Sequence, residues 1–337
     1  MDLPTVWFTL IAVLWTGYFV LEGFDFGVGA LLGVLGRDNA TRSTMLGTIG
    51  PVWDGNEVWL IVAGGATFAA FPAWYATFFS GFYLPLLVIL VALIIRAVGL
   101  EYRSKRDDAA WRRRWEACVI AGSIAPAFLW GVAFANMTAG VPINAAGNYS
   151  GSVLDLLGGY ALLGGVTTLG LFTTHGAVFL ALKTTGDLRA AARRTALRAG
   201  VITALAAVAF LIWTAVKHSD TASITLSIAA AAALVAAIAA IAAGREGWSF
   251  AATAVTIAAT VAALFTALFP DVMPSTVDAG YGLTAHGTAS TPYTLKIMTI
   301  VAGIFTPLVL LYQGWTYWVF RRRLSVPRDN GVKLPQG

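Results

Sequence analysis

Long apolar runs separated by short polar segments make up nearly the whole chain. A helix that crosses the hydrocarbon core of a bilayer needs about 20 mostly apolar residues. Runs of this length predict nine membrane-spanning helices, at Pro4–Leu35, Ile49–Phe71, Thr77–Leu100, Cys118–Ala139, Leu154–Leu182, Gly200–Val216, Ala222–Ala243, Trp248–Phe269 and Tyr293–Phe320. The predicted fold is an all-α polytopic membrane protein with two four-helix bundles and one peripheral helix.

The polar connections between these runs are short. The longest has about 20 residues, which is too few for a soluble domain of its own. We therefore expect a single transmembrane helical domain over residues 1–320, followed by a basic cytoplasmic tail at residues 321–337.

Basic residues are distributed unevenly among the connections. Of the 22 Lys and Arg residues, 19 follow odd-numbered runs, and the other three are Arg96, Lys217 and Lys296. Cytoplasmic loops of membrane proteins carry an excess of Lys and Arg. The pattern therefore predicts an N-terminus outside the cell and a C-terminus in the cytoplasm.

Composition supports the membrane assignment and excludes several other classes. The chain is 58% hydrophobic and only 12% charged, with a mean hydropathy of +0.75. A soluble protein of this length has too little interior to bury so much apolar surface. The single Cys118 excludes an intrachain disulfide and a cysteine metal cluster. We interpret the basic clusters as contacts to anionic lipid, with no nucleic acid as partner.

Two acidic residues lie inside the first apolar run, in the sequence EGFDFGVG at residues 22–29. Glu22 and Asp25 are three residues apart and project from one helix face. By the helical rise, Asp25 lies about 15 Å from the inner end of the run, near the bilayer midplane. Small residues at 23/27 and 29/33 predict close packing of a neighbouring helix over this acidic face.

The second run opens with another acidic pair at the same spacing. Asp54 and Glu57 lie in the sequence WDGNEVW at residues 53–59, at the cytoplasmic start of the predicted helix. Arg96 in the third run can neutralise one of the four carboxylates. These five residues are our candidate site. They form either a proton path or charged cofactor environment, or a structural ion-pair network that joins three helices.

Histidines and aromatic residues give weaker signals. His175 is the only histidine inside an apolar run, and without a second axial ligand at matching depth a hydrogen-bonded packing role is favoured over haem ligation. His218 and His286 fall in predicted outer loops. An interfacial aromatic belt is predicted at Trp74, Tyr75, Trp315, Tyr317 and Trp318.

The two acidic motifs occur together, as EGFDFGVG at residues 22–29 and GPVWDGNEVWL at residues 50–60. This pair closely resembles subunit II of the cytochrome bd-type quinol oxidases, and the similarity extends over the whole chain. The resemblance implies a multi-pass protein of the prokaryotic plasma membrane. It also implies a respiratory complex that oxidises quinol and reduces O2 to water with protons drawn from the cytoplasm.

The resemblance further implies how the work is divided within such a complex. Haem-bearing subunit I is the partner that ligates two b-type haems and one d-type haem, and a small single-span subunit often joins the pair. Subunit II contributes assembly, part of a proton path and, in some members, a structural quinone. We therefore expect no directly catalytic residue and no metal site in this chain. The family accepts Glu or Gln at the position of Glu57, which favours Asp25 and Asp54 as proton carriers.

Two alternatives remain open from the residues alone. Nine spans with a few buried acids are also typical of a proton-coupled secondary transporter, whose substrate would bind near the midplane at Glu22 and Asp25. A purely structural membrane scaffold is the other.

Overall fold

Eight helices in the described part of the chain are long and apolar enough to cross a membrane. The computed structural model describes residues 2–217 and 220–327. The eight helices are α1 Leu3–Leu35, α5 Tyr83–Tyr102, α6 Ala109–Ala139, α7 Gly159–Lys183, α8 Gly186–Lys217, α9 Thr221–Ala242, α10 Glu246–Leu268 and α12 Pro292–Val319. They confirm an all-α polytopic membrane protein. His218 and the tail beyond residue 327 lie outside the described residues.

The second and third predicted spans have different limits in the structure. An amphipathic helix, α2 (Asn39–Ile49), precedes α3 (Trp53–Ala70), and a short helix, α4 (Pro72–Gly81), separates α3 from α5. A proline disfavours helical conformation in the residue before it, so Pro72 ends α3 and starts α4. The hydropathy pattern predicted one span across the end of α4 and most of α5, because both helices are apolar.

Three other helices start at different points from the apolar runs that predicted them. Helices α6 and α8 begin one or more turns earlier, because their first turns are polar and carry arginines that a hydropathy window excludes. Helix α7 begins later than predicted, because residues 153–157 form a separate 3₁₀ helix, η2 (Val153–Leu157).

The end of the molecule that carries the N-terminus is covered by short elements. Strands β1 (Asp271–Met273) and β2 (Leu283–Thr284) pair antiparallel, with η3 (Ala279–Tyr281) between them and α11 (Ala285–Thr288) after them. His286 of α11 lies 2.6 Å from the Asp2 carboxylate. Hydrogen bonds from Thr5 and then from His286 hold the pKa of Asp2 well below its usual range.

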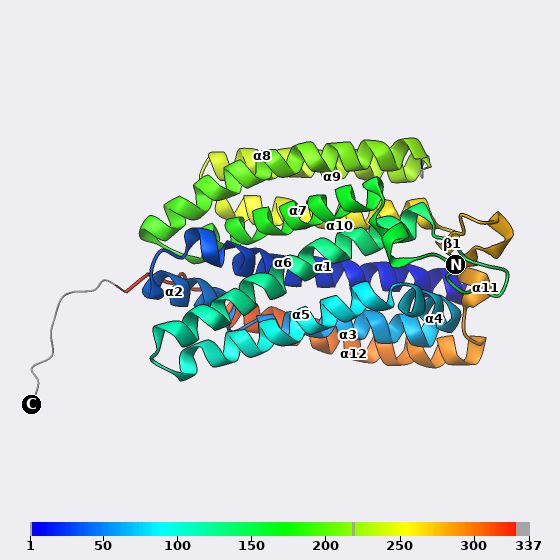
Figure 1. Cartoon of the computed structure of the whole chain (residues 1–337), viewed down its shortest axis with the longest axis horizontal. Coiled ribbons are helices and arrows are strands. Elements are labelled where there is room, and N and C mark those ends of the chain that lie inside the picture. Colours follow the sequence, from blue (N-terminus) through cyan, green and yellow to red (C-terminus); the bar gives the residue numbers. More distant parts are fainter. Residues whose placement is uncertain (1, 218–219, 328–337) are drawn as a thin grey trace, which may run out of the picture.

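Helix α1 lies at the centre of the bundle (Figure 1) and packs against α3, α6, α7 and α10. Helices α7, α8, α9 and α10 pack against one another in sequence, and α10 closes the group by returning to α7. On the other side of α1, α5 packs against α6. Helix α12 contacts only α1 and α3 appreciably and is almost entirely exposed in this chain.

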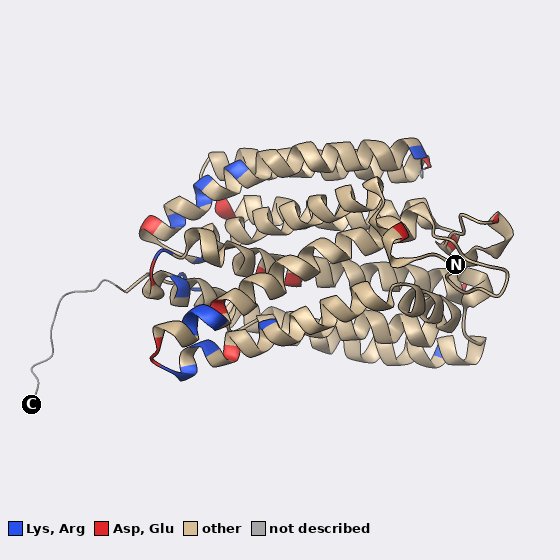
Figure 2. Ribbon diagram, in the orientation of Figure 1, with Lys and Arg blue, Asp and Glu red and all other residues tan. Residues whose placement is uncertain are grey.

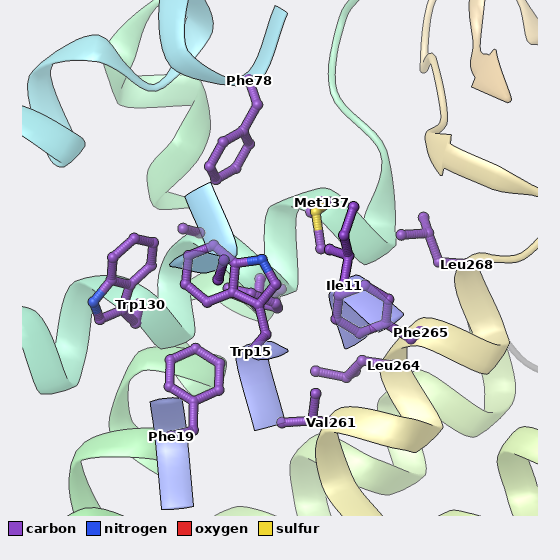
Figure 3. Close-up of a cluster of buried hydrophobic side chains, with 14 of the residues drawn as sticks. Ile11, Trp15, Phe19, Phe78, Trp130, Met137, Val261, Leu264, Phe265 and Leu268 are labelled. Carbon is purple, nitrogen blue, oxygen red and sulfur yellow. The ribbon is translucent and has the colours of Figure 1, made fainter. Parts of the chain in front are cut away.

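Aromatic and aliphatic side chains together fill the core between α1, α6 and α10 (Figure 3). The Trp15 ring lies 4.9 Å from that of Trp130 and 5.0 Å from that of Phe134, both in edge-to-face contact. Such pairs add about 0.5–1.5 kcal/mol each beyond their area burial. Trp74, which we predicted in the interfacial belt, is instead buried against Phe8 and belongs to this core.

Glycines of α1 allow its close approach to α7. A Cβ added at Gly176 would lie 2.5 Å from the Cα of Gly27, and one added at Gly23 would meet the Phe172 ring. The predicted close packing is therefore present. It falls on α7, however, whereas the acidic residues of α1 face α3 and α5. The prediction that this packing covers the acidic face was wrong for the Gly23/Gly27 pair.

We expect Gly27→Ala to destabilise the protein by about 1–3 kcal/mol, because the added methyl group forces α1 and α7 apart. Thermal unfolding of the purified complex measures this. Gly247→Ala is the matched control, since a Cβ there meets nothing within 4 Å. Equal melting temperatures for the two variants would contradict the close α1–α7 packing.

Lys and Arg gather at the end of the molecule opposite the N-terminus (Figure 2). Two buried glutamates join the helices there. Glu116 of α6 accepts hydrogen bonds from Arg42 at 2.6 Å and from Arg103 at 2.8 Å and 2.9 Å. Glu246 of α10 binds Arg189 at 2.7 Å. The Glu116 pairs join α2, η1 (Arg103–Lys105) and α6, and the Glu246 pair joins α8 to α10.

Candidate functional site

A charged cluster lies inside the helical bundle, between α1, α3 and α5. Arg96 of α5 is wholly buried, and its Nη1 donates a 2.5 Å hydrogen bond to Oε1 of Glu22. The same Nη1 lies 3.6 Å from Oε2 of Glu57, and the guanidinium carbon lies 4.9 Å from the Phe26 ring centroid. The structure thus brings together three of the five predicted site residues. Arg96 does not extend toward the membrane surface.

Asp25, the fourth predicted residue, is also wholly buried but pairs with an amide. Its Oδ2 accepts a 2.6 Å hydrogen bond from Nδ2 of Asn56. Its carboxylate is absent from the ion pairs formed by the described residues. Asp25 is therefore held by a neutral donor, whereas Glu22 and Glu57 are held by a cation.

Several polar atoms of this cluster are buried without a hydrogen-bond partner among the described residues. They are Oε2 of Glu22, Oδ1 of Asp25, Oε2 of Glu57, and Nε and Nη2 of Arg96. Buried polar groups without partners are costly, and ordered water commonly satisfies them. One guanidinium also cannot neutralise three carboxylates, so a proton bound here reduces the charge imbalance. The arrangement is suited to taking up protons and water.

Asp54, the fifth predicted residue, lies apart from the buried cluster. It is exposed in the first turn of α3, which begins directly after α2 at the basic end of the molecule. The N-cap residue Val52 offers no side-chain hydrogen bond to the first turn of α3. The positive end of the helix dipole lies in that turn and stabilises the negative charge of a carboxylate such as Asp54. The three-residue spacing puts Asp54 and Glu57 on the same side of α3, one turn apart.

Sequence reasoning missed three polar residues that complete the site. Asn56 is wholly buried, and its Oδ1 accepts hydrogen bonds from Gln313 at 3.2 Å and from Tyr317 at 2.8 Å. Tyr317 therefore points into the bundle and does not serve only the interfacial belt. One signal was available: Gln313 is the only amide side chain in the last apolar run.

His175 has both ring nitrogens engaged by protein atoms. Nε2 lies 3.2 Å from the Val20 carbonyl, which can only accept, so Nε2 carries the proton. Nδ1 then accepts the Thr253 hydroxyl at 2.6 Å. The ring also stacks on Phe250 at 4.5 Å. Both ring nitrogens are thus engaged by protein atoms, and the packing role predicted from the sequence is present.

A small apolar cavity of about 40 Å³ lies between α1, α6, α7, α8 and α10, lined by Phe19, Trp130, Phe134, Thr167 and Phe210, among others. An apolar cavity of about 150 Å³ can bind a single benzene ring. This cavity of about 40 Å³ is much smaller than that.

Comparison with known proteins assigns the chain to a family. Residues 3–320 match the family of cytochrome bd terminal oxidase subunit II. The chain is 41% identical to the cytochrome bd ubiquinol oxidase subunit 2 of Bacillus subtilis (strain 168), with 96% of this chain and 97% of that protein aligned. It is 35% identical to the cytochrome bd-I ubiquinol oxidase subunit 2 of Escherichia coli (strain K12), with 95% and 94% aligned.

A solved structure shares the fold. A chain of the bd oxidase from Geobacillus thermodenitrificans matches with a TM-score of 0.76 at 15% identity, covering 95% of this chain and 99% of that chain. Sequence motifs, helical architecture and full-length similarity therefore agree, and this chain belongs to the cytochrome bd terminal oxidase subunit II family.

Proposed function

We propose that this chain is the haem-free subunit of a complex that oxidises quinol and reduces O2 to water, and that its acidic cluster is part of the path for protons from the cytoplasm. The observation that carries the proposal is a group of three carboxylates with unpartnered oxygens, of which Glu22 and Asp25 are wholly buried and Glu57 partly buried, one helical turn from an exposed aspartate at the basic end. Membership of the family implies the oxidase complex and its partner subunit I. The chain itself is a multi-pass protein of the prokaryotic plasma membrane.

The proposed topology has nine spans, with α3 as the ninth beside the eight apolar helices. Helices α1, α3, α5 and α6 form one group of four, α7 to α10 form the other, and α12 is peripheral. The gathering of Lys and Arg at one end supports a cytoplasmic location for that end and an outer location for the N-terminus (Figure 2). Residues 321–337 are then a cytoplasmic tail, whose Leu324 is hydrogen-bonded to Lys183 and Thr185 at the α7–α8 turn.

The proposed proton path uses the two acids that Arg96 does not hold. Asp54 exchanges protons with cytoplasmic water at the start of α3. A proton then passes through water to Asp25, which becomes a neutral carboxylic acid and later releases the proton toward the partner subunit. Arg96 pairs with Glu22 and lies 3.6 Å from Glu57, so these three residues form a charged group beside the path.

The two histidines in the described part of this chain are both engaged by protein atoms, which supports haem ligation elsewhere in the complex. His175 has both nitrogens engaged, and His286 is paired with Asp2 in the outer cap. We therefore propose that the two b-type haems and the d-type haem, which supply the redox chemistry, are ligated by subunit I. The contribution of this chain is to hold and move protons and to support assembly.

We further propose that subunit I covers the outward side of α3 and α12. The side chain of Glu57, one turn along α3 from Asp54, is 21% exposed. Lipid cannot solvate carboxylates at membrane depth, so a polar protein surface or enclosed water must cover them. A small single-span subunit can join the same complex elsewhere on its surface.

The transporter alternative is not favoured, because full-length relatives are subunits of oxidases. A reduced-minus-oxidised spectrum of the complex purified from its native membrane tests the proposed function. We expect haem absorbance and a large partner subunit, with the spectrum retained in His175→Ala. Loss of a whole haem signal from assembled His175→Ala would show that this chain ligates haem. A colourless single-subunit particle would instead favour the transporter.

A further inference from the structure

Asn56 uses the full hydrogen-bonding capacity of its side chain. Nδ2 donates to Oδ2 of Asp25 at 2.6 Å and to the Leu21 carbonyl at 3.3 Å. Oδ1 accepts from Nε2 of Gln313 at 3.2 Å and from the Tyr317 hydroxyl at 2.8 Å. An asparagine amide has two donor hydrogens and two acceptor lone pairs. A wholly buried amide with four partners is fixed in place.

The orientation of this amide follows from a chain of donors and acceptors. The indole nitrogen of Trp59 can only donate, and it donates to Oε1 of Gln313 at 2.8 Å. The other group of the Gln313 amide, Nε2, must therefore donate to Asn56, and the Asn56 atom that accepts this hydrogen bond must be Oδ1. The Leu21 carbonyl, which can only accept, independently requires Nδ2 on the opposite side. The hydrogen bonds from the Trp59 side and from the Leu21 side therefore both require that Nδ2 of Asn56 faces Asp25.

This orientation distinguishes the two oxygens of Asp25. Oδ2 accepts the N–H of Asn56. A carbonyl oxygen is a stronger acceptor than a hydroxyl oxygen, so a proton placed on Oδ2 would weaken this hydrogen bond. Oδ1 is buried and has no partner among the described residues. A proton on Asp25 is therefore favoured on Oδ1, where it leaves the hydrogen bond from Asn56 to Oδ2 at full strength.

Helix α12 supplies the groups that fix Asn56. It is otherwise apolar and almost entirely exposed in this chain. Gln313 and Tyr317 are four residues apart and share a helix face, and both are half-buried against α3. The most loosely packed long helix in the described chain thus carries the residues that hold the amide beside Asp25.

We propose that Asn56 is a positioning residue for Asp25, fixed in one amide orientation by the Leu21 carbonyl and by Trp59 through Gln313 of α12, so that Asp25 takes up its proton at Oδ1. The inference rests on the proposed proton path and adds to it the orientation of the acceptor. It makes the docking of α12 a condition for efficient proton transfer.

Infrared difference spectra of the whole complex, recorded between two pH values, test this. The C=O band of protonated Asp25 is identified by its loss in Asp25→Asn. In Asn56→Leu we expect the band at higher wavenumber, because Oδ2 loses its donor, and turnover lower by about tenfold. In Gln313→Met we expect a smaller shift in the same direction, because Asn56 Oδ1 loses one of its two donors and the amide is held less firmly beside Asp25. Tyr312→Phe is the matched control: this neighbouring side chain is exposed, and both band and turnover should be unchanged.

If Asn56→Leu does not assemble, Gln313→Met carries the test, because it alters a half-buried side chain and keeps Asn56. An unshifted Asp25 band with wild-type turnover in assembled Gln313→Met would overturn the inference. Failure of the proposed function gives a different result, namely wild-type turnover in Asp25→Asn. The position of the Asp25 band in the other variants would then still report whether Asn56 orients that carboxyl.

Discussion

Arg96→Gln is expected to prevent normal accumulation of the assembled complex. The guanidinium is wholly buried and is hydrogen-bonded to Glu22, which is also wholly buried, with Glu57 as a second partner. Removing one member of a buried ion pair leaves the other charge unpaired and costs about 3–5 kcal/mol. That is a large part of the stability of a typical domain. The amount of subunit in purified membranes and the melting temperature of any complex obtained measure the loss.

Two further variants separate charge from packing in this prediction. Arg113→Gln removes an exposed arginine of α6 and should leave accumulation unchanged. Adding Glu22→Gln to Arg96→Gln removes the unpaired carboxylate and should restore part of the lost stability. A double variant no more stable than Arg96→Gln alone would show that the Arg96–Glu22 charge pair is not what holds α5 against α1.

Asp25→Asn is expected to lower oxygen consumption by about a hundredfold, the lower end of the usual effect of a proton-transfer group. Asparagine has nearly the same size as aspartate but cannot titrate. Its carbonyl oxygen can still accept the hydrogen bond from Asn56, so assembly and haem content should remain near normal. Steady-state oxygen consumption with added quinol gives the rate, and the reduced-minus-oxidised spectrum gives the haem content.

The control for Asp25→Asn is Asp107→Asn, which changes an exposed carboxylate whose side chain is 94% exposed. It should leave turnover at the wild-type rate. If Asp25→Asn instead loses assembly, Asp25 is a structural residue, and the ion-pair network becomes the better account of the whole cluster.

The sequence was sufficient to predict much of this arrangement, because lipid imposes simple rules. An apolar run of about 20 residues can only be a helix, and acids within such a run must be functional or paired. The class of fold, the positions of most helices and the five charged residues followed from that. Breaks within apolar sequence could not be predicted in this way, because hydropathy does not register that Pro72 ends one helix and starts the next.

The partners of each charged residue could not be predicted from the sequence. Asn56 and Gln313 are 257 residues apart, and their contact depends on how α12 packs against α3. The same holds for Arg96. The sequence left four carboxylates as possible partners, and the structure pairs it with Glu22 and Glu57. Local spacing predicts which residues share a helix face. It does not predict which helix that face meets.

The most direct test of the proposed path is proton uptake from the cytoplasmic side during a single turnover with O2, in the complex reconstituted into vesicles. In the wild type we expect charge movement across the membrane to accompany oxygen reduction. In assembled Asp54→Asn, with haem content unchanged, we expect this uptake to slow by at least about tenfold, because the exposed entry group at the start of α3 is lost. Uptake at the wild-type rate in assembled Asp54→Asn would contradict the account, since protons would then enter the complex elsewhere.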